Sequence, residues 1–358
     1  MAGGRVDGVG GDDVTRIARA CHSPARPMTR EHGCAMTRRM TEAVVAENLQ
    51  KRFGGVHAVR GITVTVPKGA RFGLIGQNGA GKTTFIKMLL GITRHDEGRV
   101  TVLGGDPEDP AVRRRIGYLP ERLAIPPSFS ALSFLDSVAR YKGLPSARRL
   151  SEGKDLLMQV GLEESAWNRK TGGYSKGMRQ RTGLAAALVG QPELLILDEP
   201  TDGIDPVGRK QVRDVILDVA KGGATVFLNS HLLAETEKVC DHVAVLHQGQ
   251  VVKSGPLSVL QRKDSFRVVF AATAGASLAS TIEKAQAYGF VVDPDRHDGD
   301  HDRLVTRFSG TDAAALSRGL ARALHDGLIV VEVAPELVEL ETILEAAMQK
   351  TTPRSEAA

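Results

Sequence analysis

A glycine-rich stretch followed by lysine and threonine carries the clearest chemical signal in this sequence of 358 residues. Residues 76–83 read Gly-Gln-Asn-Gly-Ala-Gly-Lys-Thr and match the pattern G-x-x-x-x-G-K-[ST], directly after the apolar run at 71–75. Glycines in such a loop let backbone N–H groups turn inward around phosphate oxygens, and the next helix adds the positive end of its dipole. We expect Lys82 to contact the β- and γ-phosphates of a nucleotide and Thr83 to hold Mg²⁺. The other expected nucleotide-binding residues here are Gly76, Asn78, Gly79, Gly81 and Thr84.

Two adjacent carboxylates form the second chemical feature. Asp198 and Glu199 follow the apolar run at 194–197, which predicts a buried strand with both acids at its C-terminal end. Open α/β sheets place their ligands at that end of the strands. One carboxylate is suited to organising Mg²⁺ and the next to activating the attacking water. We therefore expect Asp198 to bind the metal and Glu199 to act as the general base.

Alternating apolar runs and amphipathic segments predict the frame around these residues. Strands are expected at 44–49, 62–66, 71–75, 99–103, 116–119, 194–197, 224–228 and 242–246. Helices are expected at 82–90, 111–115, 176–189, 207–221 and 232–238, and residues 131–165 are mostly helical by their three- and four-residue apolar spacing. This order predicts an α/β fold with a largely parallel sheet covered on both faces.

Composition and charge exclude several classes of protein. A content of 42% hydrophobic and 25% charged residues is that of a globular chain, and the apolar runs fall far short of the ~18 residues of a membrane helix. The three cysteines are irregularly spaced, so they predict neither a disulfide framework nor a zinc site and fit a reducing compartment. The net charge of +5 comes mainly from the first forty residues. The sequence shows no concentrated basic stripe of the kind that binds nucleic acid, so we expect no nucleic-acid partner.

Further motifs lie between and after these two and resemble one family. Residues 174–181, Tyr-Ser-Lys-Gly-Met-Arg-Gln-Arg, resemble the LSGGQ-type signature of the ATP-binding subunits of ABC transporters. Residues 201–206 resemble the D-loop of that family, and 229–231 its switch-histidine loop. Phe53 stands where the family places an aromatic ring that stacks on adenine. The resemblance spans residues 43–264 and implies an ABC-type P-loop NTPase fold, with a mostly parallel sheet, antiparallel strands and a helical subdomain.

The resemblance also implies roles for individual residues. Ser175 and Gly177 would contact the γ-phosphate of ATP held by a second subunit, and Asp205 would join the nucleotide site from the D-loop. His231 would hydrogen-bond the γ-phosphate and share the catalytic role with Glu199. The sequence departs from the family pattern in having Lys176 and Met178 in the signature and Glu121 at the Q-loop position, where glutamine is usual. A carboxylate is also a ligand for Mg²⁺, so Glu121 joins Thr83 and Asp198 as a predicted metal-binding residue.

The implied function is that of an ATP-hydrolysing subunit with ATP and Mg²⁺ as cofactors. Two such subunits would form a homodimer and drive export through a separate integral membrane permease, lying peripherally on the cytoplasmic face of the membrane. The Leu-Pro-Glu form at 119–121 resembles the export branch. One alternative is a non-transport ABC-type ATPase acting on a macromolecular complex such as the ribosome or DNA, but the chain has one P-loop and no room for a long coiled coil. Another is a regulator without catalysis, which would need neither Glu199 nor His231.

Composition also suggests domain boundaries. We expect a disordered or artefactual tail at 1–40, the ATP-binding domain at 41–264 with its helical subdomain at 122–173, and a short tail at 351–358. Residues 265–350 predict a small accessory α/β domain, with strands at 266–271, 289–293, 303–308 and 328–333 and helices at 277–288, 311–325 and 336–349. The acidic run 293–302 does not match a calcium loop and predicts a solvated hairpin connection.

Overall fold

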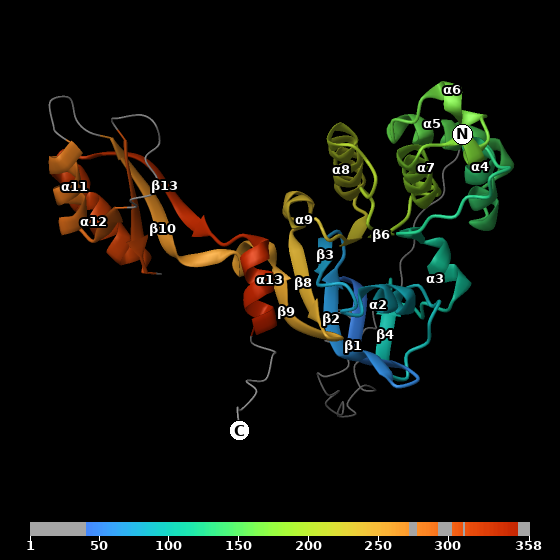
Figure 1. The fold of residues 1–358 in the computed structure, drawn as a ribbon, viewed down its shortest axis with the longest axis horizontal. Helices are drawn as coiled ribbons and strands as arrows, with labels where there is room; N and C mark the ends of the chain where they lie inside the picture. Colours follow the sequence, from blue (N-terminus) through green and yellow to red (C-terminus); the bar gives the residue numbers. More distant parts are fainter. Residues whose placement is uncertain (1–40, 272–277, 293–302, 311, 350–358) are drawn as a thin grey trace, which may run out of the picture. The chain divides into compact units, whose positions relative to one another are not determined.

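The computed structural model describes residues 41–271, 278–292, 303–310 and 312–349 of the chain (Figure 1). The predictions made for residues 1–40, for the loop 293–302 and for residues 351–358 lie outside these ranges. Within them the strands form sheets of six, three and four strands.

The six-stranded sheet positions most of the residues expected to do chemistry. Its strands follow the order β5-β6-β7-β3-β8-β9, and neighbours are parallel except for the antiparallel pair β8 and β9. Strands β6 and β7 are buried at every position, as their apolar sequences predict. Asp198 at the end of β6 lies opposite Asn229 at the end of β7. The strands are β3 (Arg71–Ile75), β5 (Ile116–Leu119), β6 (Leu194–Asp198), β7 (Thr225–Asn229), β8 (His242–His247) and β9 (Gln250–Pro256).

Alternate side chains of this sheet enter two different hydrophobic cores. On β6, Leu194 and Ile196 belong to one core, and Leu195 and Leu197 belong to the other. The first core includes helix α2 (Lys82–Leu89) and the three-stranded antiparallel sheet of β1 (Glu42–Phe53), β2 (Val56–Pro67) and β4 (Glu97–Val102). The second includes α7 (Lys176–Leu188), α8 (Pro206–Lys221) and α9 (Leu233–Val239). The prediction of a mostly parallel sheet covered on both faces is confirmed.

A largely helical region lies in the sequence between β5 and β6, which are neighbours in the sheet. It contains α4 (Ala131–Tyr141), α5 (Ser146–Gln159) and α6 (Glu164–Trp167), and follows the short helix α3 (Pro110–Arg114). Trp167 Nε1 donates to the carbonyl oxygen of Leu162 at 2.8 Å, and the Tyr174 hydroxyl donates to that of Ala166 at 2.6 Å. These bonds fix the segment that leads into α7. Among the described helices, none has the length and apolarity needed to cross a membrane.

The C-terminal residues build a four-stranded sheet with a core of its own. The order is β11-β12-β10-β13, and every pair is antiparallel. Phe270 packs edge-on against Phe290 with ring centroids 5.0 Å apart. The same core contains side chains of the helices α11 and α12, whose bounds follow. The elements are β10 (Arg262–Ala271), α11 (Leu278–Ala287), β11 (Phe290–Val292), β12 (Arg303–Ser309), α12 (Ala313–His325) and β13 (Ile329–Leu337).

The predicted start of the last helix at residue 336 is wrong. Strand β13 continues through Leu337, which pairs with Arg262, and α13 (Leu340–Gln349) begins only at Leu340. The Glu336 carboxylate accepts a hydrogen bond from Ser265 Oγ at 2.7 Å and pairs with Arg307. Cross-strand contacts therefore override the helical preference of this stretch. Three further elements were not predicted: strand β9, the short helix α10 (Leu257–Leu260) and the 3-10 helix η1 (Thr171–Gly173).

Helix α13 packs on the ATP-binding part of the chain, although its position in the sequence suggested the accessory domain. Leu340, Ile343 and Ala347 belong to the second core described above. The carboxylate of Glu237 on α9 accepts the backbone N–H of Leu340 at 2.6 Å and a hydrogen bond from Gln261 Nε2 at 2.9 Å. The chain thus returns to the ATP-binding part after forming the C-terminal sheet.

Candidate nucleotide-binding site

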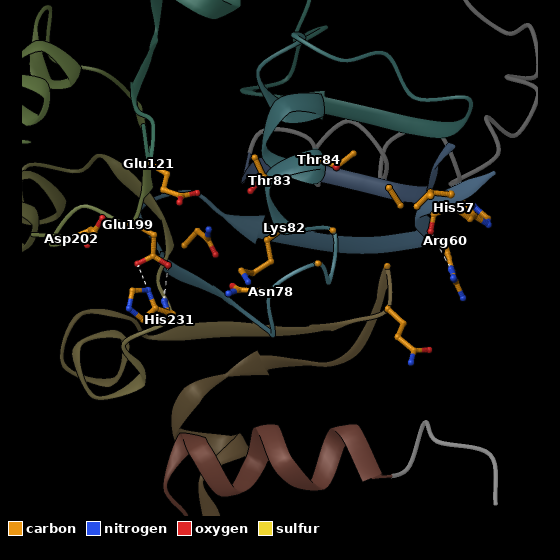
Figure 2. A pocket seen from close by; sticks show the side chains of 17 residues that line it. His57, Arg60, Asn78, Lys82, Thr83, Thr84, Glu121, Glu199, Asp202 and His231 are labelled. Carbon is orange, nitrogen blue, oxygen red and sulfur yellow. Dashed lines mark hydrogen bonds and ion pairs between the residues drawn. The ribbon is translucent and has the colours of Figure 1, made fainter. Parts of the chain in front are cut away.

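A cavity of about 640 Å³, here called the P-loop cavity, opens at the carboxyl ends of the central strands (Figure 2). It collects residues from the β1–β2 hairpin, the P-loop, the C-terminal ends of β5, β6 and β7, and the turn between β8 and β9. Of the residues predicted from sequence, it is lined by Asn78, Gly79, Gly81, Lys82, Thr83, Thr84, Glu121, Glu199 and His231. Asp202 and Asn229 also line it, and both belong to segments singled out in the sequence, 201–206 and 229–231. The sequence did not point to the remaining lining residues, Val56, His57, Ala58, Arg60, Gln248 and Gly249.

The P-loop adopts a conformation that only glycine accommodates. Gly81 has φ = 101° and stands at the N-cap of α2, and a Cβ atom there would collide with the carbonyl oxygen of Ala58. Gly79 also has a positive φ, of 80°. The loop backbone can therefore pass close to β2 and enter the N-terminus of α2, where the free backbone N–H groups of the helix can bind a phosphate.

Lys82 lies inside the loop, only 8% exposed. Its Nζ donates to the carbonyl oxygens of Gly76 at 2.6 Å and Gln77 at 3.0 Å. Burial lowers the pKa of Lys82, and the negative charges of three nearby carboxylates oppose part of that decrease: Glu199, Asp198 and Glu121. An ammonium group in this position, with weak carbonyl partners, is ready to bind the terminal phosphates of a nucleotide.

Asp198 is almost fully buried, with 1% of its surface exposed. Asn229 Nδ2 donates to its Oδ1 at 2.5 Å, and the Oδ1 atom of Asn229 has no hydrogen-bond partner. Burial raises the pKa of Asp198, and the charges of Glu121 and Glu199 raise it further against the effect of the Asn229 bond. Several negative groups thus face each other where a cation would relieve their repulsion.

Glu199 is held in place by the loop that follows β7. Its Oε1 accepts the backbone N–H of His231 at 2.8 Å, and its Oε2 lies 2.8 Å from His231 Nδ1. The Ser230 hydroxyl adds a longer contact of 3.4 Å. Figure 2 shows this pair on one side of Lys82 and the labelled residues His57 and Arg60 on the other. Glu199 can accept a proton from water there, and the imidazole can orient the same water or a phosphate oxygen.

Thr83, Glu121 and Asp198 offer a hydroxyl and two carboxylates for a hard cation. The described residues contain no cluster of three or more His, Cys, Asp or Glu side chains able to hold a metal. Mg²⁺ prefers to be held by a few protein oxygens together with phosphate oxygens and water. The residues present fit Mg²⁺ delivered with a nucleotide rather than an ion held by protein alone.

Phe53 is not among the residues that line the P-loop cavity, so the expectation that its ring stacks on adenine stays a prediction. It ends β1, is 50% exposed, and lies under Lys51 Nζ at 5.4 Å from the ring centroid. Val56, His57 and Arg60 of β2 line that side of the cavity instead. In the sequence, only the position of these three residues shortly after Phe53 in the hairpin could have indicated that they line the cavity.

Ser175, Gly177 and Asp205 line a separate cavity of about 520 Å³, the signature cavity. Ser175 is the N-cap of α7, and its hydroxyl accepts the N–H of Met178 at 3.2 Å. Asp205 is the N-cap of α8, and its carboxylate accepts the N–H of Gly208 at 2.7 Å. Within one chain, most of the predicted P-loop contacts thus line one cavity and the predicted signature and D-loop contacts line another, whereas Gly76 and Phe53 line neither.

A P-loop leading into a helix, with paired carboxylates at the end of a neighbouring parallel strand, defines a P-loop nucleotide hydrolase. The family model described as ABC transporter matches residues 59–202. An ABC transporter ATP-binding protein of Synechocystis is 37% identical over 76% of this chain and 78% of its own length. The daunorubicin resistance ATP-binding protein of Streptomyces coeruleorubidus is 34% identical over 81% of this chain and 90% of its own.

Solved structures agree with the sequence comparison. The structure of an ATP-binding subunit of an ABC transporter is 28% identical, with a TM-score of 0.57 over 61% of this chain and 91% of that one. A dimeric ATP-binding cassette holding ADP and Pi, at 22% identity and a TM-score of 0.56, shares the fold. The chain belongs to the ATP-binding proteins of ABC transporters, and it is an ATP-hydrolysing subunit. These relatives give no support to the alternative of a non-transport ATPase.

Proposed function

We propose that the chain hydrolyses Mg²⁺-ATP in the P-loop cavity with Glu199 as the general base. The observation that supports this most strongly is the Glu199 carboxylate, held by two contacts from His231 and facing the same cavity as Lys82. Thr83, Asp198 and Glu121 would hold Mg²⁺ together with phosphate oxygens. The ion would supply electrostatic neutralisation of the phosphate charge.

The separation of the two cavities supports a functional homodimer. Ser175 and Gly177 offer a hydroxyl and backbone N–H groups at the start of α7, which suit an anion, yet no Lys82 or Glu199 lies with them. Two chains placed head to tail would close each P-loop cavity with the signature cavity of the other chain. ATP would then bind between the chains, and hydrolysis would release them.

A separate membrane permease would receive this movement. The described helices contain no membrane span, so transport needs a partner, and the chain would act peripherally on the cytoplasmic face. Relatives are named for chemically different compounds: linearmycin and daunorubicin resistance, bacitracin transport and Nod factor export. Such diversity on one kind of ATP-binding chain is expected if the permease selects the cargo.

The dimer is tested with Glu199→Gln in size-exclusion chromatography. The variant keeps the size of the side chain but cannot accept a proton, so Mg²⁺-ATP should convert it to a stable dimer while ADP leaves it monomeric. A monomer with ATP under all conditions would contradict the head-to-tail arrangement. Lys82→Ala in the Glu199→Gln background is the matched control and should remain monomeric.

Membrane attachment is tested by fractionation. Expressed alone, the chain should stay largely in the soluble fraction, and co-expression with its permease should bring it to the membranes. Tight binding to protein-free liposomes would indicate an anchor in the chain itself and contradict the proposal.

A further inference from the structure

The backbone of Glu199 has a conformation that needs support. Its φ is 54°, in the left-handed region that residues other than glycine seldom occupy. Such backbone strain persists only where surrounding contacts impose it. The peptide that follows Glu199 is held by two donors to the Glu199 carbonyl oxygen: the N–H of Asp202 at 3.2 Å and Gln180 Nε2 at 3.0 Å.

Gln180 contributes this bond from helix α7, which carries the signature. Its side chain is buried, with 5% of the residue exposed, and the described contacts show its amide directed at the Glu199 carbonyl. A buried amide donor to a strained peptide holds that peptide in one orientation, because losing the bond would leave polar groups unpaired.

Lys176, one helical turn before Gln180 on α7, contacts the turn formed by residues 199–203. Its Nζ lies 2.7 Å from Asp202 Oδ2, and this hydrogen bond lowers the pKa of Asp202, so the pair stays charged. The aliphatic part of Lys176 crosses Gly203, where φ is 71° and an added Cβ would collide with it. Lys176 and Gln180 are four residues apart and share one face of α7.

We propose that Lys176 and Gln180 are positioning residues for Glu199. Together they hold the turn of residues 199–203 and fix the orientation of its strained peptide. The Glu199 carboxylate is thereby directed into the P-loop cavity. Asp202 lines the P-loop cavity and Lys176 lines the signature cavity. A change at the signature is in this way transmitted to the base of the same chain. The proposal rests on the role of Glu199 given above.

The test is a double-mutant cycle on the purified full-length chain. Gln180→Met removes the amide donor at nearly constant length, and Lys176→Met removes the charge while keeping the packing over Gly203. Each is made alone and in the Glu199→Gln background, and kcat, nucleotide Kd and melting temperature are measured. Lys221→Met on α8 is the matched control, because Lys221 forms a similarly exposed pair with Asp218 at 2.9 Å.

We expect Gln180→Met to lower kcat by ~10-fold, because it removes a buried hydrogen bond. Lys176→Met should lower it by ~3-fold, since exposed ion pairs contribute less. Nucleotide Kd should change less than ~2-fold, Lys176→Arg should restore most of the rate, and Lys221→Met should have no effect. In the Glu199→Gln background both methionine variants should be nearly silent, because residues that act through one group are not additive.

Three outcomes would overturn the proposal. One is full activity of both methionine variants, another is an equal loss in the Glu199→Gln background, and the third is a loss of kcat that only follows a lower melting temperature. A different result, wild-type hydrolysis by Glu199→Gln itself, would instead remove the assigned base and with it the proposed mechanism. The two failures are therefore distinguishable.

Discussion

The P-loop cavity and the signature cavity differ in how they present charge. The first is lined by Lys82 and Glu199, which are each less than a tenth exposed, and Asp198 is buried next to Glu199 at the end of β6. The second offers the hydroxyl of Ser175 and the start of α7, while its most prominent charge, Lys176, has a side chain that is 59% exposed and already paired with Asp202.

This difference indicates a division of labour. Charges in a low-dielectric site interact strongly with a phosphate or a metal, whereas exposed charges are screened by water. We therefore expect proton transfer and neutralisation of phosphate charge to take place in the P-loop cavity. The signature cavity has the features of an anion contact without acid–base chemistry. Substitutions in the first should change chemistry by orders of magnitude, and those in the second by much less.

Lys82→Ala should have the largest effect. It removes the ammonium group that we expect to bind the terminal phosphates in both the bound state and the transition state. Nucleotide affinity and turnover should therefore both be lost, with kcat/KM falling by at least about 10³-fold. Nucleotide titration and a phosphate-release assay measure the two losses. Lys87→Ala, on the exposed side of the same helix, is the control, and wild-type affinity in Lys82→Ala would contradict the assignment of this cavity.

Glu199→Gln should separate binding from chemistry. Binding should remain near the wild-type value, because the amide keeps the size and part of the hydrogen bonding, while hydrolysis should fall by ~10²–10⁴-fold. Single-turnover kinetics with saturating ATP gives the rate directly. Hydrolysis at the wild-type rate would transfer the role of base to Asp198 or His231.

Ser175→Ala should have a moderate effect. The change removes the N-cap of α7, which costs ~1 kcal/mol of stability, and it also removes the hydroxyl of the signature cavity, so turnover should fall by ~10-fold. Ser130→Ala, which removes the N-cap of α4, should cost similar stability and leave turnover unchanged. Equal activity of the two variants in an ATPase assay would show that Ser175 is only a helix cap.

Phe53→Ala should have the smallest effect on nucleotide binding in the P-loop cavity. The ring is half exposed and lies outside the lining, so nucleotide Kd should rise by less than ~3-fold, the weight of a weak stacking contact. His57→Ala provides the comparison from within the lining. A rise of more than ~10-fold for Phe53→Ala would mean that the ring moves onto the base when ATP binds, as the sequence resemblance implies.

Local sequence determined the parts of the protein that depend on neighbouring residues. The P-loop glycines and the apolar strand ending in Asp198 are short-range patterns, because a turn or a buried strand is defined within a few residues. The order of the segments also predicted the parallel sheet, because strands that alternate with helices pair in parallel. The carboxyl ends of parallel strands meet at one edge, where the chemical residues were expected.

Only the tertiary structure decided what these patterns face. Helix α13 packs on the ATP-binding part, and Glu336 remains in a strand because Ser265 and Arg307 hold it there. Phe53 lies outside the cavity, whereas Gln248 and Gly249, from a turn that no motif indicated, lie inside it. The pairing of Lys176 with Asp202 and of Gln180 with the Glu199 carbonyl joins residues far apart in the chain. Such contacts depend on the register of packed elements, which no local pattern of residues specifies.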